Sequence, residues 1–83
     1  MVHGMPPTVE RKAGTASEPE GFLVITEPPD GDTYEYHLEV VGEGTVTCVE
    51  KRLFDGDGSV ENLEAEATAS VENALSERGF DVE

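Results

Sequence analysis

The chain has 83 residues, of which 19 are acidic and five basic, giving a formal net charge of −14 at pH 7. This length allows one small domain whose core is near the lower limit for independent stability. There is no apolar run long enough to span a membrane, and no apolar N-terminal segment typical of a signal peptide. Nucleic-acid binding is disfavoured, because phosphate contacts require a basic stripe that this sequence lacks.

The acidic excess lies in the part of the chain expected to fold, since residues 21–83 alone carry −13. At low salt these carboxylates oppose a compact state, whereas salt near 1 M screens charges beyond about 3 Å. With few lysines and many alanines and valines, the composition resembles that of proteins from salt-accumulating haloarchaea. This resemblance implies a halophilic, cytoplasmic protein and indicates no functional family. The single cysteine, Cys48, excludes an intrachain disulfide and agrees with that compartment.

The N-terminal part is predicted to be less ordered than the rest. Residues 1–20 are polar and contain three prolines, which predicts a flexible tail with at most a short edge strand at residues 8–12. One small domain is expected over residues 21–83. Its first strand is the apolar, β-branched run 22–26, and the Pro-Pro-Asp-Gly sequence within 27–32 predicts a turn.

A hairpin is expected next. Residues 33–41 alternate between apolar and polar, residues 42–44 form a glycine-containing loop, and residues 45–54 form the third strand. With a three-residue loop, the predicted cross-strand pairs are Val40 with Val46, Leu38 with Cys48, Tyr34 with Arg52, and Glu35 with Lys51. A two-residue loop would place Glu35 against Glu50, and like charges directly opposite one another are destabilising.

From Ser59 the apolar spacing becomes that of a helix, with Ser59 as a suitable N-cap and Gly79 as a suitable end. The apolar stripe of this helix would be Val60, Leu63, Ala67, Val71, Ala74 and Leu75. Residues 80–83 alternate again and leave room for a short fourth strand. The sequence therefore predicts an α+β fold, a three-stranded antiparallel meander with one C-terminal helix packed on one face.

The two faces of this sheet are expected to differ. The helix would cover the face formed by Tyr34, Tyr36, Leu38, Val40, Val46, Cys48 and Phe54. The opposite face would gather Leu23, Ile25, Val41, Val49 and Leu53. An uncovered apolar patch of this kind is large for a monomer, so we predict a homodimer or higher oligomer joined through these five residues. The alternative is that the N-terminal tail folds over them.

Residues 54–66 match an EF-hand calcium loop in part. Counted from Asp55, the ligand positions hold Asp55, Asp57, Ser59 and Glu66. The position that requires glycine holds Val60 instead, and a strand precedes the loop where the motif has a helix. We therefore interpret the stretch as the start of a helix and expect no metal there.

Two side chains that could bind a metal or act in catalysis, His37 and Cys48, are also predicted to do neither. His37 shares a strand face with Glu35 and Glu39, but residues on one face of a strand lie about 6.6 Å apart, too far for one metal. Cys48 would need a base such as His37 beside it to act as a nucleophile, and the expected register places the two on opposite faces. We therefore predict no catalytic residue, no cofactor and no metal.

The function class that these observations favour is a non-enzymatic interaction module that self-associates, with no protein partner identified. Two other classes remain open. One is a cation- or small-ligand-binding protein that uses the acidic loop or the uncovered sheet face. The other is an acidic mimic of nucleic acid that binds a basic partner.

The charge generates a first prediction. The thermal unfolding midpoint, followed by circular dichroism, should be higher in about 2 M KCl than in about 20 mM KCl, because salt screens the repulsion between carboxylates. An unchanged midpoint would contradict the halophilic interpretation.

Overall fold

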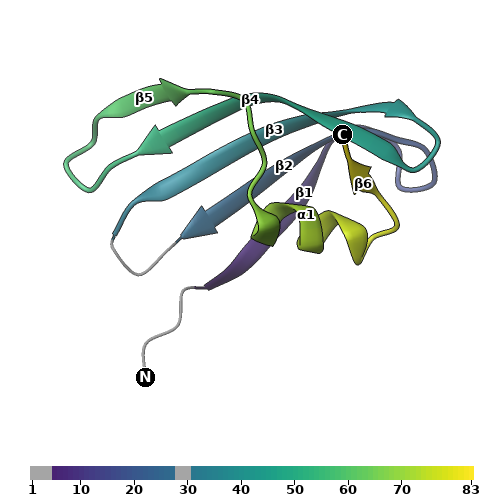
Figure 1. The fold of residues 1–83 in the computed structure, drawn as a ribbon, viewed down its shortest axis with the longest axis horizontal. Helices are drawn as coiled ribbons and strands as arrows, with labels where there is room; N and C mark the ends of the chain where they lie inside the picture. Colours follow the sequence, from purple (N-terminus) through teal and green to yellow (C-terminus); the bar gives the residue numbers. More distant parts are fainter. Residues whose placement is uncertain (1–4, 28–30) are drawn as a thin grey trace.

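The computed structural model describes residues 5–27 and 31–83. Its elements, in chain order, are β1 (Met5–Gly14), β2 (Pro19–Glu27), β3 (Thr33–Gly42), β4 (Thr45–Phe54), β5 (Val60–Leu63), α1 (Ala69–Ser76) and β6 (Asp81–Val82). Strands β1 to β5 form one antiparallel sheet in sequence order, and the short β6 pairs in parallel with β4. Helix α1 lies against one face of this sheet (Figure 1). The fold is α+β as expected, with more strands than the sequence predicted.

The core lies between α1 and the sheet. Its buried side chains come from three strands and the helix, and each is at most 4% exposed: Phe22, Val24, Tyr36, Leu38, Val46, Val71 and Leu75. Partly buried residues extend this core, among them Phe80, whose ring meets the ring of Phe22 edge-on at 5.0 Å between centroids. Residues 28–30, within the turn predicted over 27–32, lie outside the described residues.

Strand β1 corrects the expectation of a flexible tail, which is wrong for Met5–Gly14. It pairs with the outer edge of β2, with Val9 opposite Val24 and Glu10 opposite Leu23. Edge pairing satisfies main-chain hydrogen bonds and does not require an apolar sequence, so a polar segment takes this place. Because β1 extends the sheet, it does not fold over the face opposite α1.

The segment after β4 corrects the expected helix, which does not begin at Ser59. The turn between β4 and β5 closes through hydrogen bonds from Asp55 N to Ser59 O and from Gly58 N to Asp55 O, both 3.1 Å long. Val60 then lies opposite Phe54 as the first residue of β5. A glycine-rich turn of this kind favours a hairpin, and the free edge of β4 supplies the partner strand. The helix begins only at Ala69.

A bulge in the hairpin of β3 and β4 shifts its register. The predicted pairs of Val40 with Val46 and of Leu38 with Cys48 are confirmed. Beyond them one extra residue, Val49, enters β4, as in a β-bulge. The pairs that follow are His37 with Glu50, Tyr36 with Lys51, Glu35 with Arg52, Tyr34 with Leu53 and Thr33 with Phe54. The predicted pairs of Tyr34 with Arg52 and of Glu35 with Lys51 are therefore wrong.

In the part of β4 that follows Val49, the bulge also places each side chain on the sheet face opposite to the predicted one. Leu53 pairs with Tyr34 on the α1 side, so its expected place on the uncovered face is wrong. Phe54 pairs with Thr33 away from the helix, so its expected place in the core is wrong as well. The register after the bulge also places Lys51 on the α1 side. Its Nζ lies 5.4 Å from the ring centroid of Tyr34 and 5.0 Å from that of Tyr36.

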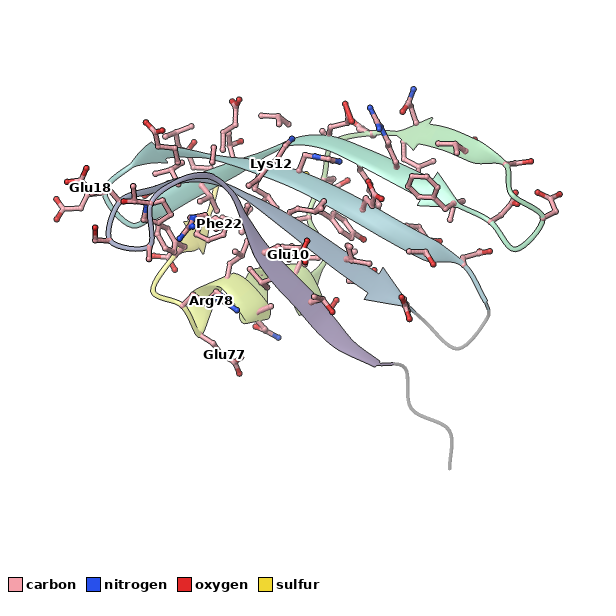
Figure 2. All side chains as sticks on the ribbon, turned by 180° about the vertical axis from the view of Figure 1, so that it is seen from behind. Glu10, Lys12, Glu18, Phe22, Glu77 and Arg78 are labelled. Atoms are coloured by element: carbon pink, nitrogen blue, oxygen red, sulfur yellow. The ribbon has the colours of Figure 1, made fainter. Side chains whose placement is uncertain are left out.

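We call the sheet face away from α1 the open face. By pairing and alternation it carries Glu10, Lys12, Leu23, Ile25, Glu35, His37, Glu39, Val41, Val49, Glu50, Arg52, Phe54 and Val60. Figure 2 shows Lys12 on this face and Arg78 on the side of α1. One face of the sheet thus supports the core, and the other meets no further element among the described residues.

The place of β1 in the sheet generates a second prediction. At Gly14, φ is +86°, and an added Cβ would lie 2.4 Å from Glu18 O and 2.5 Å from Glu20 N. Gly58 has a similar φ of +95° but open space around it. Gly14→Ala should therefore lower the free energy of unfolding by about 2 kcal/mol more than Gly58→Ala, which suffers only the left-handed backbone strain. Urea unfolding in molar KCl measures both variants, and equal effects would indicate that β1 is not docked.

Candidate functional site

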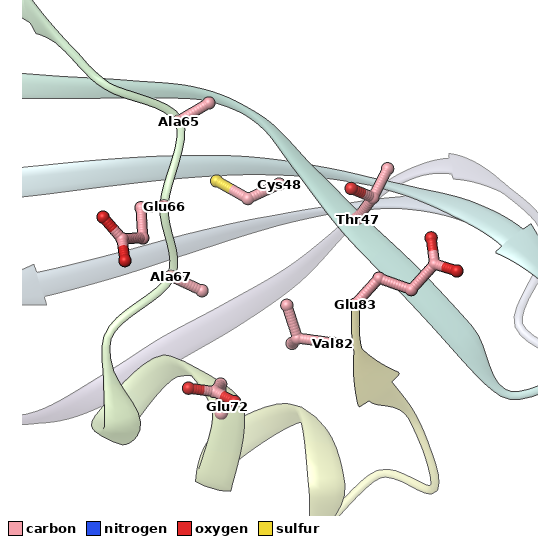
Figure 3. Close-up of a pocket in the computed structure, with 8 residues that line it drawn as sticks. All are labelled: Thr47, Cys48, Ala65, Glu66, Ala67, Glu72, Val82 and Glu83. Carbon is pink, nitrogen blue, oxygen red and sulfur yellow. The ribbon is translucent and has the colours of Figure 1, made fainter.

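Cys48 lies in a hollow of about 240 Å³ on the α1 side (Figure 3). It occupies the part of β4 between the residues that pair with β5 and those that pair with β6. The carboxylates that line this hollow belong to Glu66, Glu72 and Glu83. Negative charges disfavour a thiolate, so this environment does not activate the sulfur.

The thiol itself is held in its neutral form. Burial raises the pKa of Cys48, and this effect exceeds the lowering by a backbone hydrogen bond of Glu50 that favours the thiolate and by the charge of Lys51. As a neutral thiol, Sγ donates to the backbone oxygen of Glu50 at 3.5 Å. His37 lies on the open face, whereas Cys48 pairs with Leu38 on the α1 side. The two side chains are therefore on opposite faces, as predicted, and His37 does not serve Cys48 as a base.

The four calcium-ligand candidates are not brought into one loop. Asp55 Oδ1 accepts hydrogen bonds from the backbone N–H groups of Asp57 at 3.1 Å and Ser59 at 3.3 Å. Asp57 Oδ1 accepts a further bond from Ser59 N at 3.0 Å. The pKa of Asp57 is lowered, mainly by a hydrogen bond with the Asp55 side chain and then by those from Ser59. These carboxylates bind the turn into β5, and Glu66 instead lines the hollow beside Cys48.

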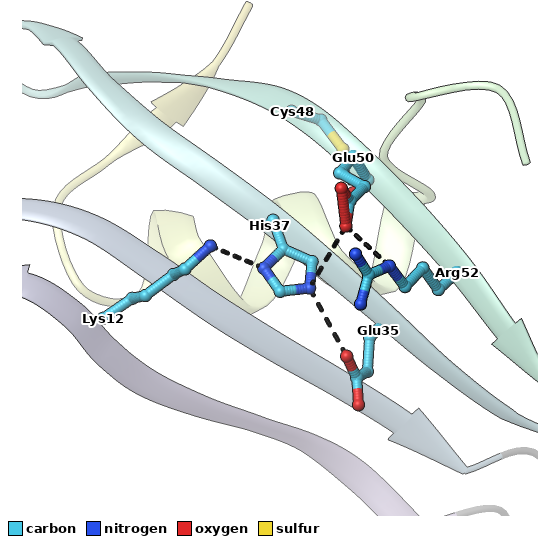
Figure 4. Close-up of polar contacts among 6 residues, drawn as sticks. All are labelled: Lys12, Glu35, His37, Cys48, Glu50 and Arg52. Carbon is cyan, nitrogen blue, oxygen red and sulfur yellow. Dashed lines mark hydrogen bonds and ion pairs between the residues drawn. The ribbon is translucent and has the colours of Figure 1, made fainter. Parts of the chain in front are cut away.

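A cluster of charged side chains crosses the open face (Figure 4). Lys12 Nζ lies 2.7 Å from His37 Nδ1. The other ring nitrogen of His37, Nε2, lies 3.4 Å from Glu35 Oε1 and 3.9 Å from Glu50 Oε1. Arg52 Nε completes the series at 2.7 Å from Glu50 Oε1. We call these five residues the open-face cluster.

The contact with Lys12 fixes the hydrogen-bond roles of the His37 ring. A lysine ammonium only donates hydrogen bonds, so Nδ1 accepts, and Nε2 faces the Glu35 carboxylate. The His37 side chain is only 13% exposed. Lys12 and Arg52 balance Glu35 and Glu50, so the open-face cluster has no net charge in a chain of −14. This balance distinguishes it from the acidic remainder of the molecule.

Apolar side chains surround the open-face cluster. Leu23 and Ile25 on β2 are half-buried. Val41, Val49 and Val60 are 52%, 46% and 56% exposed. The sequence had placed four of these residues on this face, and it missed Val60 and its partner Phe54. The Asp-Gly turn at residues 55–58 was the signal that could have revealed this pairing, because it predicts a hairpin.

Among the described residues, no group of three or more histidine, cysteine, aspartate or glutamate side chains is arranged to hold a metal ion. The open-face cluster contains His37, Glu35 and Glu50, but its cations already engage the ring and a carboxylate. This arrangement is a charge-balanced group of side chains bordered by apolar residues on the open face.

No helix of residues 5–27 and 31–83 has the length and apolar character needed to cross a membrane.

No family model matches the sequence, and comparisons with curated proteins and with solved structures found no match. The function of the chain must therefore be argued from its own geometry and charge.

The environment of Cys48 generates a third prediction. Because burial raises the pKa of its thiol, a higher pH is needed to form the reactive thiolate. Alkylation by iodoacetamide should reach its half-maximal rate at a higher pH than in a short unstructured cysteine peptide. In urea, the pH dependence of the alkylation rate should become that of the peptide. A half-maximal rate at a lower pH in the folded chain would show an activated thiol and contradict this account.

Proposed function

We propose that the chain is a non-enzymatic, halophilic interaction module that self-associates through the open face. The observation that carries this proposal is the open-face cluster, a charge-balanced group of side chains bordered by exposed and half-buried apolar residues. The interface would consist of Leu23, Ile25, Val41 and Val49, with Phe54 and Val60 in the place expected for Leu53.

The distribution of charge favours the open face over the rest of the surface as the site of self-association. Two copies, each with a net charge of −14, repel one another, and the repulsion is weakest where local charges cancel. The open-face cluster meets that condition, because Lys12 and Arg52 balance two of its glutamates. The other acids of this face, Glu10 and Glu39, are exposed, and molar salt screens exposed charges of this kind.

The apolar surround supplies the attractive part of the contact. A stable interface typically buries about 800 Å² on each partner, which is about one-seventh of the 5367 Å² surface of this chain. Burial of apolar area persists in molar salt, so association should strengthen as the carboxylates are screened. Burial of apolar area against a second copy would also add stability to a chain whose own core is small.

The open face generates a fourth prediction. Light scattering in about 2 M KCl should report at least twice the mass of one chain, because salt screens the carboxylates and preserves apolar contact. Val49→Glu should weaken the association by at least about tenfold, because it places an unpaired carboxylate in the contact.

The control variant is Ala69→Glu, which adds the same charge at the exposed start of α1, away from the open face. It should leave the mass unchanged. A monomer at high protein concentration, or an equal loss of mass in both variants, would contradict association through the open face.

A further inference from the structure

The basic residues of this acidic chain fall into two groups. There are five of them: Arg11, Lys12, Lys51, Arg52 and Arg78. Lys12 and Arg52 belong to the open-face cluster, and Lys51 lies over two tyrosine rings. Arg11 and Arg78 form no ion pair with a carboxylate among the described residues, although the chain has 19 acids. Both line the same hollow.

This hollow, which we call the arginine hollow, has a volume of about 230 Å³. It lies on the α1 side, separate from the open face, and is lined by Arg11, Ala16, Pro19, Phe22, Arg78 and Phe80. Its residues come from β1, the β1–β2 loop, β2 and the segment between α1 and β6. Segments far apart in the sequence thus bring two guanidinium groups to one apolar surface.

Arg78 is positioned by the end of the helix. The turn after α1 closes through hydrogen bonds from Gly79 N to Ser76 O and from Phe80 N to Leu75 O, both 2.9 Å long. From this turn Arg78 Nη2 reaches the backbone oxygen of Val9 at 3.5 Å, which holds the side chain against β1. Arg11 lies on the same strand, opposite Phe22. Both arginines are exposed, so a ligand can approach them from solvent.

The apolar part of the hollow is equally well defined. Phe22 is 4% exposed and meets Phe80 edge-on, which fixes both rings against the core. A cavity of about 150 Å³ accommodates benzene, so 230 Å³ holds one ring together with a carboxylate group. Guanidinium groups match the planar geometry of a carboxylate.

We propose that the arginine hollow binds a small organic monocarboxylate, whose apolar body lies on Pro19 and Phe80 and whose carboxylate is held by Arg11 and Arg78. This proposal is independent of self-association, because the hollow is on the other side of the sheet from the open face.

The chemistry of the hollow favours a monocarboxylate over inorganic phosphate. A phosphate ion would leave the aromatic surface without an apolar partner, so no apolar area would be buried on binding. A dianion also meets greater repulsion from a chain with a net charge of −14 than a monoanion does.

Benzoate is a suitable probe, followed by amide chemical shifts in ¹H–¹⁵N spectra of the intact chain in about 2 M KCl, where salt screens long-range repulsion. Benzoate should shift the amides of Phe22, Arg78 and Phe80 in a saturable manner. Benzyl alcohol, which has the ring without the charge, should bind at least about tenfold more weakly, since it lacks the charge-assisted hydrogen bonds. Inorganic phosphate should bind more weakly than benzoate.

Variants then identify the groups that hold the carboxylate. Arg11→Gln and Arg78→Gln should each weaken benzoate binding by at least about tenfold, the change expected for a lost charge-assisted hydrogen bond. The matched control Lys51→Gln removes an equal charge from β4, outside both the open-face cluster and the arginine hollow, and should change the affinity by less than about twofold, because charges at a distance are screened in molar salt.

Three results would overturn the proposal: benzyl alcohol that binds as tightly as benzoate, phosphate that binds more tightly than benzoate, or unchanged affinity in both arginine variants. The comparison of probes needs only the unaltered chain, so it holds even if a variant folds poorly.

Discussion

The single extra residue in β4, Val49, determines which side chains meet on each face of the sheet. Before the bulge Cys48 lies opposite Leu38, and after it Glu50 lies opposite His37. Without this shift, Val49 would lie opposite His37, and the contact between Arg52 and Glu50 would lie on the face that α1 covers. Bulges of this kind commonly redirect side chains near functional surfaces. The charge balance of the open-face cluster therefore depends on one local irregularity of the backbone.

The distribution of charge follows from this division into two faces. In a chain with so few basic residues, the place of each cation decides where acidic repulsion is relieved. Two cations balance the two glutamates of the open-face cluster, and one lies over Tyr34 and Tyr36 on the α1 side. The remaining two gather beside Phe22 and Phe80. The surfaces proposed for contact with another copy and with a small anion thus lie on opposite sides of one sheet.

The apolar periodicity of the sequence predicted the strands whose register is fixed by pairs of apolar side chains. The strand pattern around Leu38 gave the correct register as far as Cys48, because apolar pairs fix it there. The loop predicted over residues 42–44 is shorter in the structure, where Gly42 belongs to β3 and pairs with Thr45. The bulge at Val49 leaves no signal in the alternation of a short strand.

The apolar periodicity did not predict β1 and β5, which form because their main chains pair with a neighbouring strand. Met5–Gly14 forms an edge strand by pairing its main chain with β2, with Val9 packed against the core, and Val60–Leu63 has an apolar spacing that suits a helix as well as a strand. The free edge of β4 settles that choice, since strand preference depends on the available partner. The sheet face of the candidate interface residues was predicted correctly for Leu23, Ile25, Val41 and Val49, which precede or form the bulge. It was wrong for Leu53, which follows the bulge. The open-face cluster joins three strands, so it required the register of both β1 and β4.

Cross-strand nuclear Overhauser effects between β3 and β4 test the central claim most directly, because they report the register itself. The bulged register predicts contacts between backbone protons of His37 and Glu50, and between the ring of Tyr36 and the side chain of Lys51. Contacts of His37 with Val49 and of Glu35 with Lys51 would show an unbroken ladder. That result would place Glu50 and Arg52 on the covered face and contradict the account of the open face.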